Sequence, residues 1–196
     1  MAIKIFIMTR LPHAGLNKKR LSKDIGNVKV KNLLLKNLEN CKKIFLKKKN
    51  WTLYYYLDKK EIFRSFSFSY YKNIITQHGQ DLGKKMWNLK NKFNDEVILF
   101  GSDIPNINFS AIKLASNILK NNEIVIGPSF DGGFWLIGFA NKKKIGYPFH
   151  DIRWSTKHAL KDLELNLNKS RISFKFTEKL RDIDILEDYC DYEDRF

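Results

Sequence analysis

The chain has 196 residues, of which 43% are hydrophobic and 14% aromatic, so it can bury a substantial core and is not an intrinsically disordered protein. Lys and Arg number 36 against 21 Asp and Glu, and the resulting net charge of +15 would favour polyanionic partners. The basic residues are scattered through a composition rich in Lys, Asn, Ile and Phe, and no nucleic-acid motif accompanies them. We therefore expect no specific nucleic-acid partner.

Short apolar runs alternate along the chain with amphipathic stretches, which favours a mostly parallel sheet covered by helices. In chain order, the pattern predicts a strand at 3–8, a helix at 30–41, strands at 51–57 and 63–68, a helix at 82–93, a strand at 97–100, a helix at 109–120, strands at 124–126 and 134–139, a helix at 156–167, a strand at 172–176 and a helix at 185–192. No repeat or linker interrupts this pattern, so we expect residues 1–196 to form a single α/β domain.

The loop after the first strand combines a turn with positive charge. Pro12 and Gly15 shape this loop, and Arg10, Lys18 and Arg20 supply the charge. In an open α/β sheet, ligands bind beyond the carboxyl ends of the strands, where backbone N–H groups and cations hold phosphates. The spacing matches neither a Walker loop nor G-x-G-x-x-G, so an ordinary basic surface loop is an equally good interpretation of these residues alone.

A carboxylate, Asp103, comes directly after the wholly apolar strand at 97–100. Gly101 permits close approach of the backbone, and Pro105 prevents the strand from continuing. A hard divalent cation takes one or two carboxylates together with substrate phosphates, so Asp103 is a candidate metal ligand. The alternative is an Asp turn or a cap of the following helix.

A turn with two glycines, Asp131-Gly132-Gly133, joins the strands at 124–126 and 134–139. Asp-Gly is a standard signal for a β-hairpin, which is the simpler interpretation. However, the neighbouring Phe130 and Trp135 are more apolar than an exposed turn requires. Backbone exposed at the two glycines is therefore also a candidate surface for a sugar or an acceptor.

Two polar residues lie near predicted helix starts. Asp81 precedes the helix at 82–93 and is expected to be its N-cap. Ser155, which follows Trp154, either caps the helix at 156–167 or binds an anion at its N-terminus.

Two more carboxylates lie just before the last predicted helix. Asp184, with Glu187 three residues later, has the spacing of a capping box. Asp182 and Asp184 also offer the second carboxylate that a metal site beside Asp103 would require.

In their order and spacing, these motifs resemble the bacterial family of small GT-A-type transferases of arsenosugar biosynthesis, also called selenodomain-associated glycosyltransferases, in the nucleotide-diphospho-sugar transferase superfamily. The family motifs are AKxPxxGxxKTRL at residues 9–21, QxGxDLGxRM at 77–86, GSDxP at 101–105, GPxxDGGxxLIG at 127–138, WST at 154–156 and DxDTxED at 182–188. The chain departs from the family at Arg10, Lys19, Lys85 and Ile185, where Lys, Thr, Arg and Thr are usual.

The resemblance implies a Rossmann-like GT-A fold with a mixed, mostly parallel sheet flanked by helices, which binds a nucleoside diphosphate with Mg²⁺ or Mn²⁺. The implied nucleotide- and phosphate-binding residues are Arg10, Leu11, Pro12, Gly15, Lys18, Arg20, Asp81 and Ser102. The implied metal ligands are Asp103 and Asp184, and the implied catalytic residues are Asp103, Asp131 and Asp184. The implied acceptor side consists of Gly132, Gly133, Trp154 and Ser155.

The first expected function is metal-dependent glycosyl transfer from a nucleotide-diphosphate sugar to a small-molecule acceptor. The alternative is transfer of a nucleotide from a nucleoside triphosphate to a phosphorylated acceptor, as in guanylyltransferases, because both reactions need the same metal and diphosphate site. The third possibility is a non-catalytic nucleotide or nucleic-acid binder that exploits the positive charge.

The cysteine count and the hydropathy suggest where the protein works. Cys41 and Cys190 lie far apart without C-x-x-C spacing, which argues against a disulfide framework or a zinc site. No run of about 18 apolar residues is present, and the apolar stretch at 3–8 is too short for a signal peptide. We therefore expect a cytoplasmic protein without a transmembrane segment.

Overall fold

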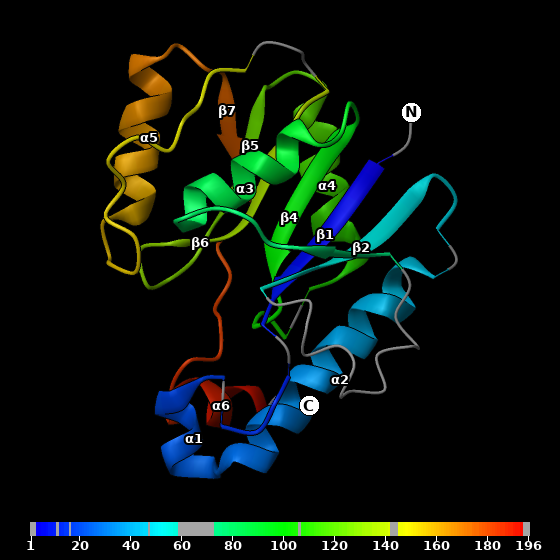
Figure 1. Ribbon diagram of the computed structural model, residues 1–196, viewed down its shortest axis with the longest axis vertical. Helices are drawn as coiled ribbons and strands as arrows, with labels where there is room; N and C mark the ends of the chain where they lie inside the picture. Colours follow the sequence, from blue (N-terminus) through cyan, green and yellow to red (C-terminus); the bar gives the residue numbers. More distant parts are fainter. Residues whose placement is uncertain are drawn as a thin grey trace.

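A seven-stranded sheet forms the centre of the computed structural model, which describes residues 3–10, 12–15, 17–46, 48–58, 73–105, 107–141 and 145–193 (Figure 1). Its strands are β1 (Ile3–Thr9), β2 (Trp51–Leu57), β3 (Ile74–Thr76), β4 (Glu96–Gly101), β5 (Ile124–Pro128), β6 (Phe134–Phe139) and β7 (Phe174–Phe176). The spatial order is β3-β2-β1-β4-β6-β5-β7, and β6 runs antiparallel to β4 and β5 while the other pairs are parallel. The expected mixed, mostly parallel sheet is confirmed.

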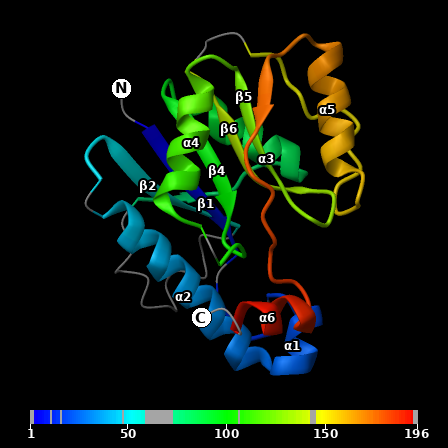
Figure 2. The same cartoon turned by 180° about the vertical axis from the view of Figure 1, so that it is seen from behind.

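Helices cover both faces of this sheet. The helices of the described residues are α1 (Lys19–Ile25), α2 (Asn27–Phe45), α3 (Leu82–Asn91), α4 (Phe109–Leu119), α5 (Ala159–Lys169) and α6 (Leu186–Glu193). Helices α2 and α4 pack on one face, and α3 and α5 pack on the other (Figures 1 and 2). Among the described residues, no helix combines the length and apolar character needed to cross a membrane.

The central strand β1 shows why its sequence is an unbroken apolar run. Ile5, Phe6 and Ile7 are fully buried because successive side chains of a strand point to opposite faces and both faces are covered. Ile5 and Ile7 belong to the core beneath α2 and α4, whereas Phe6 belongs to the core beneath α3 and α5. Because helices cover both of its faces, β1 lies with its neighbour β4 in the middle of the molecule.

A smaller third cluster lies beyond the carboxyl ends of the central strands. It joins α1, the start of α2 and the C-terminal segment, through Leu21, Val30, Leu33, Leu34, Ile183 and Tyr192. Figures 1 and 2 both show α1 and α6 side by side at this end of the molecule. Residues near both ends of the chain are therefore brought to the sheet edge where α/β proteins bind ligands.

Most predicted elements are confirmed within a few residues, one begins later than expected, and two observed elements were not predicted. The helix predicted at 156–167 begins only at Ala159, because residues 156–158 form a turn in which the Thr156 hydroxyl accepts a 3.2 Å hydrogen bond from the His158 N–H. Its N-cap is His158, so the capping role of Ser155 is a wrong prediction. Helix α1 and strand β3 were not anticipated, and the strand predicted at 63–68 lies outside the described residues.

Candidate active site

The turn after β4 holds Asp103 at the carboxyl end of the sheet. Its carboxylate folds back over Gly101, where a Cβ atom would lie 2.5 Å from Asp103 Oδ1. The Ser102 hydroxyl donates a 2.8 Å hydrogen bond to Thr9 Oγ1, and the Ser102 carbonyl accepts one of 3.2 Å from Asn37 Nδ2. Ser102 thus ties the turn to β1 and α2, while Gly101 leaves room for the carboxylate.

Helix α4 does not use Asp103 as a cap. Its N-cap is Asn108, whose side chain accepts a 2.9 Å hydrogen bond from the backbone N–H of Ala111. The capping alternative for Asp103 is therefore wrong, and its carboxylate is available for other contacts.

Lys18 places its ammonium group among carboxylates from two distant segments. Lys18 Nζ lies 2.9 Å from Asp103 Oδ2, 3.3 Å from Asp184 Oδ1 and 4.0 Å from Asp182 Oδ2. The lysine is the N-cap residue of α1 with a left-handed φ of 46°, and only 13% of its side chain is exposed. A residue that the resemblance assigns to phosphate binding is thus paired with the implied metal ligands.

The electrostatics of this cluster are set by burial and by neighbouring charges. Burial by itself would lower the pKa of Lys18, but attraction to Asp103, Asp184 and Asp182 outweighs it and raises that pKa. Burial, and then the negative charge of Asp103, raise the pKa of Asp182 to about 6, although Lys18 opposes this shift. At neutral pH the cluster therefore holds a charged lysine and an excess of negative charge.

The segment before α6 brings Asp184 to the cluster. Ile183 is buried in the third cluster, and its N–H donates a 3.1 Å hydrogen bond to the Asp103 carbonyl. Asp188 Oδ2 accepts hydrogen bonds of 3.1 and 3.2 Å from the N–H groups of Asp184 and Ile185. The predicted Asp184–Glu187 capping box is therefore wrong: the returning carboxylate comes from Asp188, which leaves the Asp184 side chain to meet Lys18.

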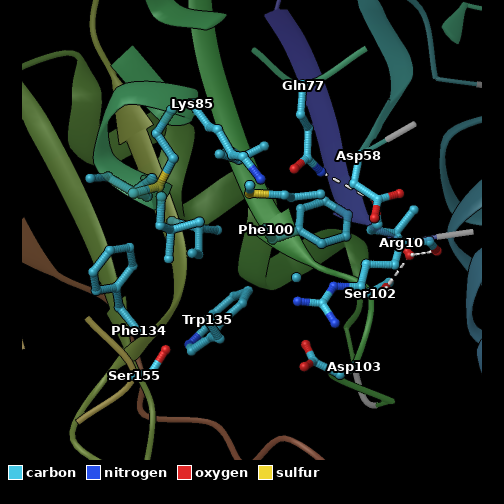
Figure 3. Close-up of a pocket in the computed structure, with 18 of the residues that line it drawn as sticks. Arg10, Asp58, Gln77, Lys85, Phe100, Ser102, Asp103, Phe134, Trp135 and Ser155 are labelled. Carbon is cyan, nitrogen blue, oxygen red and sulfur yellow. Dashed lines mark hydrogen bonds between the residues drawn. The ribbon is translucent and has the colours of Figure 1, made fainter. Parts of the chain in front are cut away.

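A cavity of about 870 Å³ runs along the carboxyl edge of the sheet, over the ends of β1 and β4 and the start of the antiparallel β6 (Figure 3). The predicted site residues on its wall are Arg10, Lys18, Asp81, Ser102, Asp103, Ser155 and Asp184. Figure 3 shows the Arg10 guanidinium and the Asp103 carboxylate directed toward the same part of the cavity. The arrangement joins cationic groups suited to phosphate with carboxylates suited to a cation.

Asp81 has the structural role that the sequence indicates. Its Oδ1 accepts a 2.8 Å hydrogen bond from the backbone N–H of Lys84, which confirms it as the N-cap of α3. Asp81 also lies on the cavity wall, where a nucleotide could reach it. Its role in nucleotide binding stays a prediction.

Other predicted residues lie away from the cavity wall. They are Pro12, Gly15, Arg20, Asp131, Gly132, Gly133 and Trp154, while Leu11 lies outside the described residues. Arg20 is 80% exposed but still reaches Asp184 at 3.5 Å.

The Asp131 turn has a clear structural role. Asp131 Oδ1 accepts hydrogen bonds from Ser129 Oγ at 2.6 Å and from the Gly133 N–H at 2.9 Å. Gly132 has a φ of +86° and its backbone lies against the Lys157 carbonyl, so a larger residue would not fit. The hairpin interpretation is confirmed by the antiparallel pairing of β5 and β6, and catalysis by Asp131 stays a prediction.

The cavity wall also contains residues for which no role was predicted from the sequence. Polar side chains come from Asp58, Gln77, Gln80 and Lys85, and aromatic ones from Phe100, Phe134 and Trp135. Trp154, expected on the acceptor side, packs behind this wall with ring centroids 6.2 Å from Phe134 and 5.9 Å from Phe149. The Q-x-G-x-D-L-G motif was the available signal for Gln77, but without the sheet order its side chain could not be placed.

The carboxylate oxygens of the cluster are suitable ligands for a hard divalent cation, but they come from too few side chains to hold one alone. The Asp103 and Asp184 carboxylates come from different segments and converge on one positive charge, that of Lys18. Oxygen donors of this kind are those that Mg²⁺ and Mn²⁺ prefer. Within the described ranges, however, no group of three His, Cys, Asp or Glu side chains is arranged to hold a metal.

The family comparison matches more than half of the chain. A family model described as "Uncharacterized protein conserved in bacteria (DUF2064)" matches residues 46–156. No curated protein matches the chain.

Solved structures show the same fold. A candidate nucleotide-diphospho-sugar transferase from Desulfovibrio desulfuricans G20 superposes with a TM-score of 0.86 at 26% identity, covering 96% of this chain and 85% of that one. CMP:2-keto-3-deoxy-manno-octonic acid synthetase complexed with CTP gives a TM-score of 0.60 at 11% identity, covering 100% and 97%. Rv0371c from Mycobacterium tuberculosis H37Rv, in complex with manganese, gives 0.56 at 11% identity, covering 100% of both chains.

Proposed function

The chain belongs to the bacterial DUF2064 family and has the fold of nucleotide-diphospho-sugar transferases, and from this starting point we propose that it is a metal-dependent glycosyltransferase with a nucleotide-diphosphate sugar as donor. The proposal is supported above all by Asp103, whose carboxylate lies at the rim of a large cavity together with Arg10 and Lys18. A diphosphate needs cations around it, and a departing diphosphate needs more as its charge grows.

Each of these residues has a role that follows from its chemistry. The Arg10 guanidinium is always charged and can donate two parallel hydrogen bonds to phosphate oxygens. Asp103 and Asp184 would hold a Mg²⁺ or Mn²⁺ ion, which would supply positive charge to the departing diphosphate. The manganese found in Rv0371c, which shares the fold, agrees with this choice of ion.

Lys18 occupies the place of that ion between the two carboxylates. Its ammonium contacts both Asp103 and Asp184, so the lysine and a divalent cation compete for the same oxygen atoms. The lysine keeps two like charges together that would otherwise repel each other. A metal held by the carboxylates would leave the lysine free to contact phosphates bound by Arg10.

The acceptor belongs at the β6 end of the cavity. Phe134 and Trp135 give this end an apolar wall, and Ser155 adds a hydroxyl. An aromatic wall with a few polar groups suits the mixed surface of a sugar ring. Trp135 is held in place in this wall, because it is only 3% exposed and its Nε1 donates a 3.1 Å hydrogen bond to the Glu178 carbonyl.

Nucleotidyl transfer is the second candidate. Arg10, Lys18 and Lys85 all line the cavity, and three cations suit a triphosphate as well as a diphosphate. The fold is also that of a synthetase solved with CTP, although at 11% identity this likeness concerns the fold alone.

The product of the reaction separates the two candidates. The protein is incubated with Mn²⁺, a mixture of small acceptors, and either a panel of nucleotide-diphosphate sugars or the four nucleoside triphosphates. Release of nucleoside diphosphate from the sugar donors supports glycosyl transfer, and release of pyrophosphate from the triphosphates supports nucleotidyl transfer. Metal-independent binding of nucleic acid, lost steeply with salt and unaffected by Asp103→Asn, would instead favour the non-catalytic binder.

A further inference from the structure

Gln77 follows directly after β3 and reaches across the ends of two neighbouring strands. Its backbone N–H donates a 2.6 Å hydrogen bond to the Leu57 carbonyl, which extends the pairing of β2 with β3. Its side-chain Nε2 donates to the Tyr56 carbonyl at 2.8 Å and to the Thr9 carbonyl at 3.3 Å. Only 9% of the residue is exposed, so the side chain is held in one place.

These contacts fix which way the amide faces. A primary amide nitrogen has two hydrogens, and both backbone partners of Gln77 are carbonyl oxygens that can only accept. Turning the amide over would set its own oxygen against two carbonyl oxygens, which is repulsive. The nitrogen therefore faces the strands, and Oε1 is left as an acceptor with both lone pairs.

The acceptor faces the cavity rather than the protein. Gln77 belongs to the cavity wall, and Figure 3 shows its side chain reaching inward from the upper rim. Within the described residues, no donor forms a hydrogen bond with Oε1, although the nitrogen of the same amide makes two. Because this oxygen is fixed in position and partly shielded from water, a ligand that covers it without donating a hydrogen bond loses binding affinity.

The sheet order indicates which part of a nucleotide meets this acceptor. The groups suited to the diphosphate and its metal, Arg10 and Asp103, lie beyond the ends of β1 and β4 in the middle of the cavity. The apolar wall of Phe134 lies to one side of them on β6, and Gln77 lies to the other side, beyond β2 and β3. A nucleotide-sugar whose diphosphate is central extends its sugar to one side and its base to the other.

We propose that Gln77 Oε1 accepts a hydrogen bond from an N–H group of the nucleobase and so favours the nucleotide whose donor lies opposite this fixed oxygen. This inference rests on the proposed nucleotide-binding function and adds a specificity residue to it. The two bonds from Nε2 preorganise the acceptor, because they hold the amide before the ligand arrives.

A purely structural role for Gln77 makes a different prediction. As a brace between β1, β2 and β3, the residue would need only its two donor bonds, and its oxygen would be irrelevant. Changing the donor on the ligand, while the protein stays intact, distinguishes the two roles.

The test measures binding of GDP, UDP, CDP and ADP to the wild-type protein with Mn²⁺ by calorimetry. Each nucleotide is paired with an analogue whose Watson–Crick N–H donors are replaced by N-methyl groups. The same eight ligands are then titrated into Gln77→Met, which has a similar length but lacks the amide and so has neither the acceptor oxygen nor the two donor bonds. Thermal unfolding of each variant reports whether the three strands remain joined.

We expect the wild-type protein to prefer one nucleotide and to lose about tenfold or more in affinity for its methylated analogue, the cost of an unpaired acceptor. In Gln77→Met, the preference among the four bases and the penalty for methylation both shrink to about twofold or less, because the acceptor is gone.

Two results would overturn the inference, and they have different meanings. If Gln77→Met binds nucleotides with an unchanged base preference and an unchanged methylation penalty, Gln77 is only a brace and nucleotide binding itself stands. If none of the four nucleoside diphosphates binds the wild-type protein, the inference falls together with the proposed function.

Discussion

Lys18 Nζ donates a 2.9 Å hydrogen bond to Asp103 Oδ2, although 85 positions separate the two residues in the chain. The contact joins the loop after β1 to the turn after β4 on the wall of the cavity. It also sets a limit on metal binding, because the ammonium occupies the side of the carboxylate that faces Asp184.

The first prediction concerns this competition. In Lys18→Met, Mn²⁺ should bind more tightly in the absence of nucleotide, by about fivefold, the equivalent of an ion pair of about 1 kcal/mol. Electron paramagnetic resonance of free Mn²⁺ measures the affinity without any need for activity. Lys4→Met is the matched control, since Lys4 pairs with Asp95 at the opposite edge of the sheet, and its affinity should be unchanged. Weaker Mn²⁺ binding by Lys18→Met would contradict the competition.

The second prediction concerns Gly101. In Gly101→Ala the new methyl group would lie 2.5 Å from Asp103 Oδ1, so the carboxylate must turn away. We expect Mn²⁺-dependent nucleotide binding to weaken at least about tenfold, with a loss of stability of about 1 kcal/mol or less, because the strain is relieved by moving one side chain. Gly146→Ala is the control, because its nearest neighbour would be 4.0 Å away and both properties should be unaffected. Full nucleotide binding by Gly101→Ala would show that the direction of Asp103 is unimportant.

The third prediction is a pH dependence of stability without metal. The pKa of Asp182 is raised from 3.8 to about 6, so between these values the folded state binds more protons than the unfolded state. The contribution of Asp182 to the free energy of unfolding must therefore fall as pH rises from about 4 to about 6. Urea denaturation at several pH values measures the slope. Asp182→Asn should remove this decrease in stability with pH, whereas the control Asp95→Asn should keep it. If the free energy of unfolding changes equally with pH in the wild-type protein and both variants, the raised pKa of Asp182 is refuted.

The fourth prediction distinguishes the two possible capping residues of α6. Asp188→Ala should lower the free energy of unfolding by about 1 kcal/mol, because its carboxylate accepts from two backbone N–H groups at the helix start. Glu187→Ala should change stability by less than about 0.5 kcal/mol, the range of ordinary surface substitutions. Chemical denaturation compares the two variants, and a larger loss in Glu187→Ala would restore the capping box expected from the sequence.

The sheet was predictable because its central strands are apolar on both faces. Runs such as those of β1 and β4 leave few alternatives to a covered, mostly parallel sheet. Helix α1 and strand β3 escaped prediction for the opposite reason. Helix α1 has seven residues with Leu21 as its buried residue, and β3 has three half-buried residues, so neither has enough sequence for a period to show.

The candidate site was predictable only where a motif itself determines the geometry. Gly101 and Asp103 lie in one turn, so their relationship could be stated from the sequence alone. The contact of Lys18 with Asp103 and Asp184 depends on how α1 and α6 pack together, which no local pattern encodes. The capping box was misplaced by one residue because Glu187 and Asp188 are both acidic, and only packing decides which of them points to the helix start.

The central claim is that Asp103 holds the metal that accompanies the nucleotide. Calorimetric titration of a nucleoside diphosphate, with and without Mn²⁺, into the wild-type protein, Asp103→Asn and the control Asp95→Asn tests it most directly. We predict Mn²⁺-dependent binding in the wild-type protein and in Asp95→Asn, and its loss in an Asp103→Asn protein that still unfolds cooperatively. Full Mn²⁺-dependent binding by folded Asp103→Asn would contradict the claim.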